Sequence, residues 1–277
     1  MRTWIETDPQ HAARLTDARL QLHHAAQFGA ALGISYLPKQ PDDSHTNLGW
    51  NDALGALMSH EARGATGAVA LGVRVHDLSL VITRDGAEIA ALPLHGRTNA
   101  TATDALVALL AAAGLDPARF TLARHYELPR HPVADGAPYD ASQAESFRAL
   151  AAWLGNSAIE LGRVARTVPQ ASEVRLWPHH FDIATLITVA YGASTGAGLA
   201  MGDGYYDEPY FYVNAHPEPD RSQLSDPLAG GGTWHTHEWI GAVLPGSRVK
   251  GDAMTQQAQV RSYLDASLAA CRALVCA

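Results

Sequence analysis

The chain has 277 residues, of which 47% are apolar and 17% charged, with a formal net charge of -8 and a mean hydropathy of -0.09. This length is enough to bury a large core in one domain or in two closely packed halves. The excess of acidic over basic residues argues against a surface that binds the phosphates of a nucleic acid. No apolar run approaches the roughly 18 residues that a membrane span needs, and the first ten residues show no pattern of a secretory signal.

Cysteine usage indicates a reducing compartment. The chain has two cysteines, Cys271 and Cys276, both at the end of a predicted helix. An offset of five residues points them to different faces of that helix, which disfavours a disulfide between them. A chain without a disulfide framework is typical of the cytoplasm, so we expect a cytoplasmic protein.

Apolar periodicity and capping signals predict four helices. The first begins near Asp8-Pro9, a pair suited to a helix start, and a second spans about 103–113 before Gly114. A third starts with the capping-box pattern Ser142-x-x-Glu145, and the last covers about 252–275. The first helix carries one apolar stripe at alternating spacings of three and four residues: Leu15, Ala18, Leu22, Ala25, Gly29 and Leu32.

Strand-like runs lie between these helices rather than alternating with them. Asp85-Gly86 is typical of a tight hairpin joining two such runs. Because the strands come in groups, the sequence predicts an α+β fold with antiparallel sheets and not a parallel βαβ fold. The predicted strands cover residues 69–75, 78–83, 87–92, 121–126, 180–189, 209–215 and 233–244.

The order of elements suggests two similar helix–antiparallel sheet–helix halves within a single compact domain, 1–277. The segment 89–97 (IAALPLHGR) resembles 240–248 (IGAVLPGSR) at the entry to the last helix of each half. We therefore predict an internal duplication with halves 1–127 and 141–277. The Pro- and Gly-rich stretch 128–140 is the predicted linker between them.

Aromatic residues and histidines concentrate in the second half. Ten of the 20 aromatics and five of the 14 histidines lie between Trp177 and Trp239. A wall of polar-tipped aromatics with imidazoles among them is typical of a ligand cleft. The predicted ligand-binding platforms are Trp177, Tyr206, Tyr210, Trp234 and Trp239.

Two short clusters in this region predict a metal centre. His180 and Asp182 share a face if their segment is a strand, and so do His235 and His237. If the two strands are neighbours, three imidazoles and a carboxylate converge, a set that suits zinc or iron. Water on such a metal would become a hydrolytic nucleophile, with Glu208 or Glu238 as its base. The first hypothesis is thus a metal-binding protein, with hydrolysis as its candidate reaction.

Two other functions stay open. The same aromatics could form a metal-free module that binds a small polar or sugar-like molecule, and they could instead form an interface for oligomerisation. In the first half, histidines occur at His23, His24, His45 and His125. Each of these alone is typical of a surface or core position, although His45 would line the cleft if the two halves face each other. Substrate, oligomeric state and physiological role do not follow from the sequence.

Six segments are similar to a group of uncharacterised bacterial proteins that share a domain of unknown function. The resemblance spans nearly the whole chain and implies a one-piece architecture, without implying an activity. The segments are LHHAAQ (22–27), SHTNLGW (44–50), HYELP (125–129), WPHHFDIATL (177–186), GDGYYDEPYFYV (202–213) and WHTHEWIGAVLPGSR (234–248).

Overall fold

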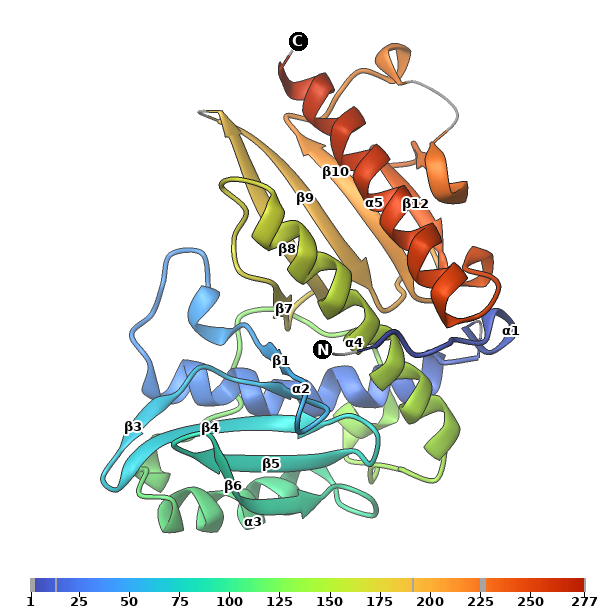
Figure 1. Cartoon of the computed structure of the whole chain (residues 1–277). Coiled ribbons are helices and arrows are strands. Elements are labelled where there is room, and N and C mark those ends of the chain that lie inside the picture. Colours follow the sequence, from blue (N-terminus) through green and yellow to red (C-terminus); the bar gives the residue numbers. More distant parts are fainter. Residues whose placement is uncertain (1–2, 13, 191, 225–227, 277) are drawn as a thin grey trace. The chain divides into compact units, whose positions relative to one another are not determined.

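The fold was analysed in a computed structural model, which describes residues 3–12, 14–190, 192–224 and 228–276. It confirms the predicted α+β class, with two antiparallel sheets that are each flanked by helices (Figure 1). The chain divides into two compact units. Unit 1 comprises 1–16, 152–175 and 182–277, and unit 2 comprises 17–151 and 176–181.

Unit 2 holds a sheet with the strand order β1-β2-β4-β5-β6, in which β3 also pairs with β4. Helix α2 packs closely on this sheet, because Gly29 lies against the carbonyl of Leu71 in β4. The predicted stripe of α2 is buried, but so are most of its other faces. The elements are α2 (Thr16–Tyr36), β1 (Gly49–Asn51), β2 (Ala56–Met58), β3 (Ala62–Gly64), β4 (Gly67–Arg74), β5 (Ser79–Arg84), β6 (Ala87–Pro93) and α3 (Asn99–Ala112).

Local signals account for two features of unit 2. Asp85 and Gly86 both have positive φ, 49° and 79°, so they form the predicted two-residue turn between β5 and β6. Thr98 caps α3 by accepting a hydrogen bond from the backbone N–H of Thr101. The helix ends before Gly114, whose φ of 92° no other residue type adopts easily. Turn and cap chemistry thus set these boundaries.

Unit 1 holds the second sheet, in which neighbouring strands run in the order β11-β12-β10-β9-β8. Helices α4 and α5 lie along one face of this sheet (Figure 1). β7 (Arg175–Trp177) spans the boundary between the units, and α4 passes from one unit into the other at Ala152. The remaining elements are α1 (Pro9–Ala12), α4 (Ala144–Thr167), β8 (Asp182–Ala190), β9 (Ala193–Ala200), β10 (Tyr210–His216), β11 (Thr233–His235), β12 (Gly241–Pro245) and α5 (Ala253–Cys276).

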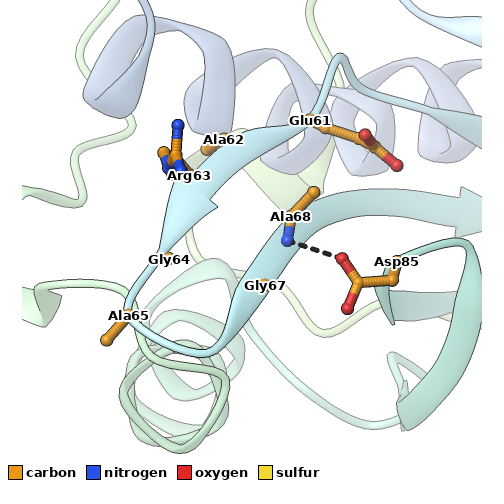
Figure 2. Close-up of a pocket in the computed structure, with 8 residues that line it drawn as sticks. All are labelled: Glu61, Ala62, Arg63, Gly64, Ala65, Gly67, Ala68 and Asp85. Atoms are coloured by element: carbon orange, nitrogen blue, oxygen red, sulfur yellow. Dashed lines mark hydrogen bonds between the residues drawn. The ribbon is translucent and has the colours of Figure 1, made fainter.

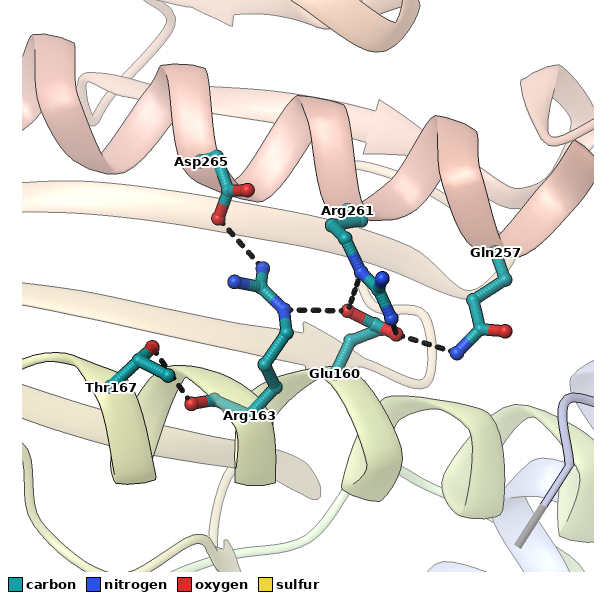
Figure 3. A network of polar contacts seen from close by, with 6 residues as sticks. All are labelled: Glu160, Arg163, Thr167, Gln257, Arg261 and Asp265. Carbon is teal, nitrogen blue, oxygen red and sulfur yellow. Dashed lines mark hydrogen bonds and ion pairs between the residues drawn. The ribbon is translucent and has the colours of Figure 1, made fainter.

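A buried carboxylate joins α4 to α5. Glu160 is fully buried, and its two oxygens accept hydrogen bonds from Arg163, Arg261 and Gln257 at 2.8–3.1 Å (Figure 3). Arg163 also reaches Asp265 of α5 at 2.7 Å. Burial raises the pKa of Glu160, but the hydrogen bonds from these three partners outweigh it and lower the pKa below its ordinary value. The carboxylate therefore stays charged and fixes the two helices to each other.

The segment before α1 is tied to the same two helices. The side-chain amide of Asn156 in α4 bonds both the N–H and the carbonyl of Ile5. The amide of Gln256 in α5 bonds Trp4 and Thr7. Both amides are fully buried. Residues 4–7 are therefore part of the packed layer of unit 1.

Three predicted strands were wrong in whole or in part. Residues 121–126 form no strand. Their backbone N–H groups donate to side chains instead of to a neighbouring strand, as Thr121 N–H does to the Ser35 hydroxyl. Segment 180–189 begins as a turn, and β8 starts only at Asp182. Segment 233–244 is two antiparallel strands, β11 and β12, joined by a turn. Five strands were not predicted: β1, β2, β3, β7 and β9.

The division into units does not follow the predicted linker. Residues 128–140 lie wholly inside unit 2, and the chain crosses between units at Thr16, Ala152, Arg175 and Phe181. Both units nevertheless combine an antiparallel sheet with flanking helices, and the duplication stays a prediction. In the part of the chain that the structure describes, no helix combines the length and apolarity needed to cross a membrane.

Candidate functional site

Six rings gather on the side of the unit 1 sheet that α4 and α5 leave uncovered. We call this set the aromatic face: Tyr205, Tyr206, Tyr210, Tyr212, His235 and Trp239. The register places Tyr210 and Tyr212 of β10 on this side, since Phe211 and Val213 point into the core. Through its pairing with Gly241, His235 of β11 shares that side. Three of the predicted ligand platforms, Tyr206, Tyr210 and Trp239, therefore lie together.

Glycines in the sheet make room for these rings. A Cβ at Gly198 of β9 would lie 2.6 Å from Cζ of Tyr212, and one at Gly241 would overlap the indole of Trp239. Both rings therefore lie directly over backbone that carries no side chain. The unusual glycine content of these strands is explained by this close approach.

Each tyrosine hydroxyl of the aromatic face donates to a fixed acceptor. Tyr205 donates to Glu238 at 2.8 Å, Tyr210 to Asp203 at 2.6 Å, and Tyr212 to Asp182. Burial and the neighbouring Asp203 raise the pKa of Tyr210, while the hydrogen bond to Glu238 raises that of Tyr205. Carboxylates thus hold these three rings by their hydroxyl groups, and the hydroxyls stay protonated at neutral pH.

His235 uses both of its ring nitrogens. Its Nε2 lies 2.7 Å from the carbonyl oxygen of His237, which can only accept, so Nε2 carries the proton. Its Nδ1 then accepts from the Tyr206 hydroxyl at 3.0 Å. The ring also stacks on Trp239, with centroids 4.4 Å apart. In this arrangement His235 is a hydrogen-bonding member of the aromatic face.

Within unit 1, the structure does not bring the predicted metal ligands Asp182, His235 and His237 to one point. Asp182 begins β8 and His235 ends β11, with β9, β10 and β12 between their strands. His237 is exposed in the turn after β11, and His180 belongs to unit 2. Within the described residues, no group of three or more His, Cys, Asp or Glu side chains is arranged to hold a metal ion.

The assumed alternation of side chains fails in both pairs. Phe181, with φ 59°, turns the chain between His180 and Asp182. A residue in this left-handed region interrupts a strand, so its two neighbours no longer share a face. β11 ends at His235, so His237 lies in the turn that follows the strand.

The two glutamates predicted as bases have structural partners. Glu208 accepts from the backbone N–H of Ser247 at 2.6 Å and from its hydroxyl at 2.9 Å, and so fixes the turn after β12. Glu238 accepts from Tyr205 at the edge of the aromatic face and is exposed. Their roles as bases stay predictions.

The two remaining platforms lie elsewhere. Trp234 is opposite Ala242 in the register of β11 and β12, so it points to the face that carries α5. Trp177 belongs to unit 2, where its ring lies 6.0 Å from that of His179.

A second constellation lies in unit 2, and we call it the imidazole site: Asp43, His125, Tyr126, Trp177, His179 and His180. His125 Nε2 lies 3.1 Å from the carboxylate of Asp43. The rings of His179 and His180 are 4.3 Å apart, and Tyr126 lies 5.7 Å from His179. Burial, followed by the charge of His180, lowers the pKa of His179. Three distant stretches of sequence therefore meet here.

Buried polar groups of α2 hold this site in place. His23 Nε2 and Gln27 Nε2 both donate to the carbonyl of Pro178, at 2.8 and 2.9 Å. Gln27 Oε1 accepts from the Tyr126 hydroxyl at 2.8 Å. His23 also stacks on the buried Phe181 at 4.6 Å. Two buried side chains thus fix the turn that carries His179 and His180.

Sequence reasoning assigned each histidine of the first half singly and missed this convergence. The usable signal was the pairing of polar and aromatic residues in LHHAAQ (22–27), HYELP (125–129) and WPHHFDIATL (177–186). The contacts above join residues of all three. His45 is only two residues from Asp43 in the sequence. Its Nδ1, however, accepts a hydrogen bond from the backbone N–H of Gln40.

A cavity of about 510 Å³ in unit 2 does not match the predicted cleft (Figure 2). It runs along β3 and the start of β4, and its lining contains neither histidine nor aromatic residues. Its carboxylate Asp85 accepts from Ala68 N–H and so belongs to the hairpin. The lining residues are Glu61, Ala62, Arg63, Gly64, Ala65, Gly67, Ala68 and Asp85.

Comparison with known proteins adds no functional assignment. No protein-family model, no curated protein and no solved structure matches this chain. Arguments about function therefore rest on the aromatic face and the imidazole site alone.

Proposed function

We propose that the aromatic face of unit 1 binds a small polar, sugar-like molecule without a metal ion. One observation carries the proposal: Tyr206, Tyr210 and Trp239 lie in one cluster with His235 on a single side of the sheet. They come from two stretches of the chain, 205–212 and 235–239. Flat rings with polar rims are what ligands with both apolar faces and hydroxyl groups require.

The aromatic face offers both kinds of contact. The Tyr205 side chain is 44% exposed, and Tyr206 and Trp239 are partly exposed. The carboxylate of Glu238 and the exposed Asp203 lie at its edge as acceptors for ligand hydroxyls. Since the tyrosine tips are held by hydrogen bonds, little side-chain entropy would be lost on binding.

The state of His235 favours this function over a metal centre on the same face. A metal ligand must offer a ring nitrogen lone pair. Here Nε2 is protonated toward His237, and the lone pair of Nδ1 accepts from Tyr206. Metal binding would have to break one of these bonds, whereas a ligand resting on the exposed rings breaks neither.

The test is a binding screen on the full chain after treatment with a chelator. Saturation-transfer NMR with neutral mono- and disaccharides and polyols should detect compounds that bind to the wild-type protein. Tyr205→Ala, which removes an exposed ring, should reduce affinity about tenfold, the equivalent of losing roughly 1.4 kcal/mol of contact.

The matched control is Leu186→Ala. Leu186 is 52% exposed and lies on the same side of the sheet, in β8. This variant should bind like the wild type. Equal loss in both variants, or no binding of any neutral polyhydroxy compound, would refute the proposal. Elemental analysis of the untreated protein tests the metal hypothesis separately.

A further inference from the structure

We propose that the imidazole site of unit 2 binds a divalent transition-metal ion, with His179 and His180 as the primary ligands and His125 and Asp43 completing the set. This inference is independent of the function proposed for unit 1. It keeps His180 from the sequence prediction and replaces its partners.

The ring nitrogens distinguish this site from the other histidine clusters. His23 and His24 donate Nε2 to backbone carbonyls, and His235 uses both nitrogens. By contrast, neither His179 nor His180 has a hydrogen-bond partner for its ring among the residues that the structure describes. Their lone pairs are available, and imidazole nitrogen is a preferred ligand of zinc, copper and nickel.

The spacing of the two rings suits one shared ion. With metal–nitrogen bonds of about 2.0–2.1 Å, two imidazoles in adjacent coordination positions have centroids roughly 4.5–5 Å apart. The centroids of His179 and His180 are 4.3 Å apart. The pair therefore needs only small side-chain rotations to share an ion.

The pair stands on a fixed base. The carbonyl of Pro178 is held by both His23 and Gln27, and Phe181 is buried at a φ of 59°. A non-glycine residue in this conformation persists where the surroundings impose it. Such support around a ligand pair is what fixes ligand orientation in metal sites.

The further ligands have to move to join the pair: the Tyr126 ring lies 5.3 Å from that of His125 and 5.7 Å from that of His179. His125 Nε2 lies 3.1 Å from the Asp43 carboxylate, and the two side chains are 64% and 30% exposed. Exposed side chains reorient at little cost in packing. This explains how a site can exist although no group of three ligands is already arranged around one point in the described residues.

The experiment uses the full chain, prepared without a polyhistidine tag and stripped with a chelator. Calorimetric titration with Zn²⁺ should give one equivalent bound. His179→Ala and His180→Ala should each weaken binding about tenfold or more. With Cu²⁺ in place of zinc, electron paramagnetic resonance should show hyperfine coupling to at least two imidazole nitrogens, and His180→Ala should remove one of them.

The matched control is His95→Ala, which removes another exposed histidine of unit 2. It should bind zinc like the wild type. Absence of stoichiometric zinc binding to the folded wild type would overturn the proposal. So would unchanged affinity in a folded His179→Ala/His180→Ala double variant, with folding checked by circular dichroism.

Discussion

The His23 imidazole illustrates how a buried polar side chain makes stability depend on pH. Burial, which is only partly offset by the hydrogen bond to Pro178, lowers its pKa from 6.5 to about 3. Between these two values the unfolded chain takes up a proton that the folded chain does not. The contribution of His23 to the free energy of unfolding should therefore be fully present above pH 6.5. It should decrease as the pH falls toward 3.

This decrease can be measured by urea unfolding at several pH values. The His23 contribution is on the order of 4 kcal/mol at its limit. His23→Gln keeps a donor for the Pro178 carbonyl but does not titrate. Its stability should fall less steeply than that of the wild type between pH 6.5 and 4.5. Parallel curves for the two proteins would contradict the assignment.

Gly198 belongs to the same scale, because one Cβ decides whether the aromatic face can form. Gly198→Ala places a methyl group 2.6 Å from Cζ of Tyr212, whose hydroxyl is bonded to Asp182. We expect a loss of about 1–3 kcal/mol in the free energy of unfolding, as for overpacked cores.

The control for this prediction is Gly196→Ala, two residues earlier in β9. Its Cβ would meet only the amide oxygen of Asn214, an exposed side chain that can turn away. This variant should lose less than about 0.5 kcal/mol. Equal losses measured by chemical denaturation would show that Tyr212 does not lie over the glycine.

At the scale of elements, the contact between α4 and α5 depends on Glu160. Glu160→Gln removes the charge that Arg163 and Arg261 share, while both arginines keep partial access to water. We expect a loss of about 2 kcal/mol, less than for a pair in which both partners are buried. Thermal or chemical unfolding at pH 7 measures this loss.

Asp265→Asn is the comparison, since Asp265 is 54% exposed and pairs only at the rim with Arg163. An exposed pair contributes less than about 1 kcal/mol. Because the pKa of Glu160 is lowered from 4.5, its stabilisation is present above pH 4.5 and lost as the pH falls below that value. A larger effect of Asp265→Asn than of Glu160→Gln would contradict this account.

The elements that the sequence predicted well carry their own local signals. The turn at Asp85-Gly86 and the end of α3 at Gly114 follow from backbone preference. β9 was missed because five of its eight residues are Ala or Gly, which have weak strand preference. It is a strand because β8 and β10 pair with it on both sides.

At the scale of the whole molecule, the sites depend on contacts that no local pattern encodes. The aromatic face needs Tyr206, Tyr210 and Trp239 on one side of a sheet, and this part of the candidate site could be predicted from clustering alone. The imidazole site needs α2, the segment around His125 and the turn at Phe181 to meet. Without knowledge of which segments are neighbours, the metal prediction joined His180 to His235, whereas the structure places the His180 ring beside that of His179.

The most direct test of the aromatic face as a ligand site is a ¹⁹F NMR titration of protein labelled with 5-fluorotryptophan. The resonance of Trp239, assigned with Trp239→Phe, should shift in a saturable way as a bound neutral saccharide is added. The resonance of Trp153, which is 1% exposed in α4, should stay in place. A saccharide that binds while leaving the Trp239 resonance unchanged would place the ligand elsewhere and contradict the account.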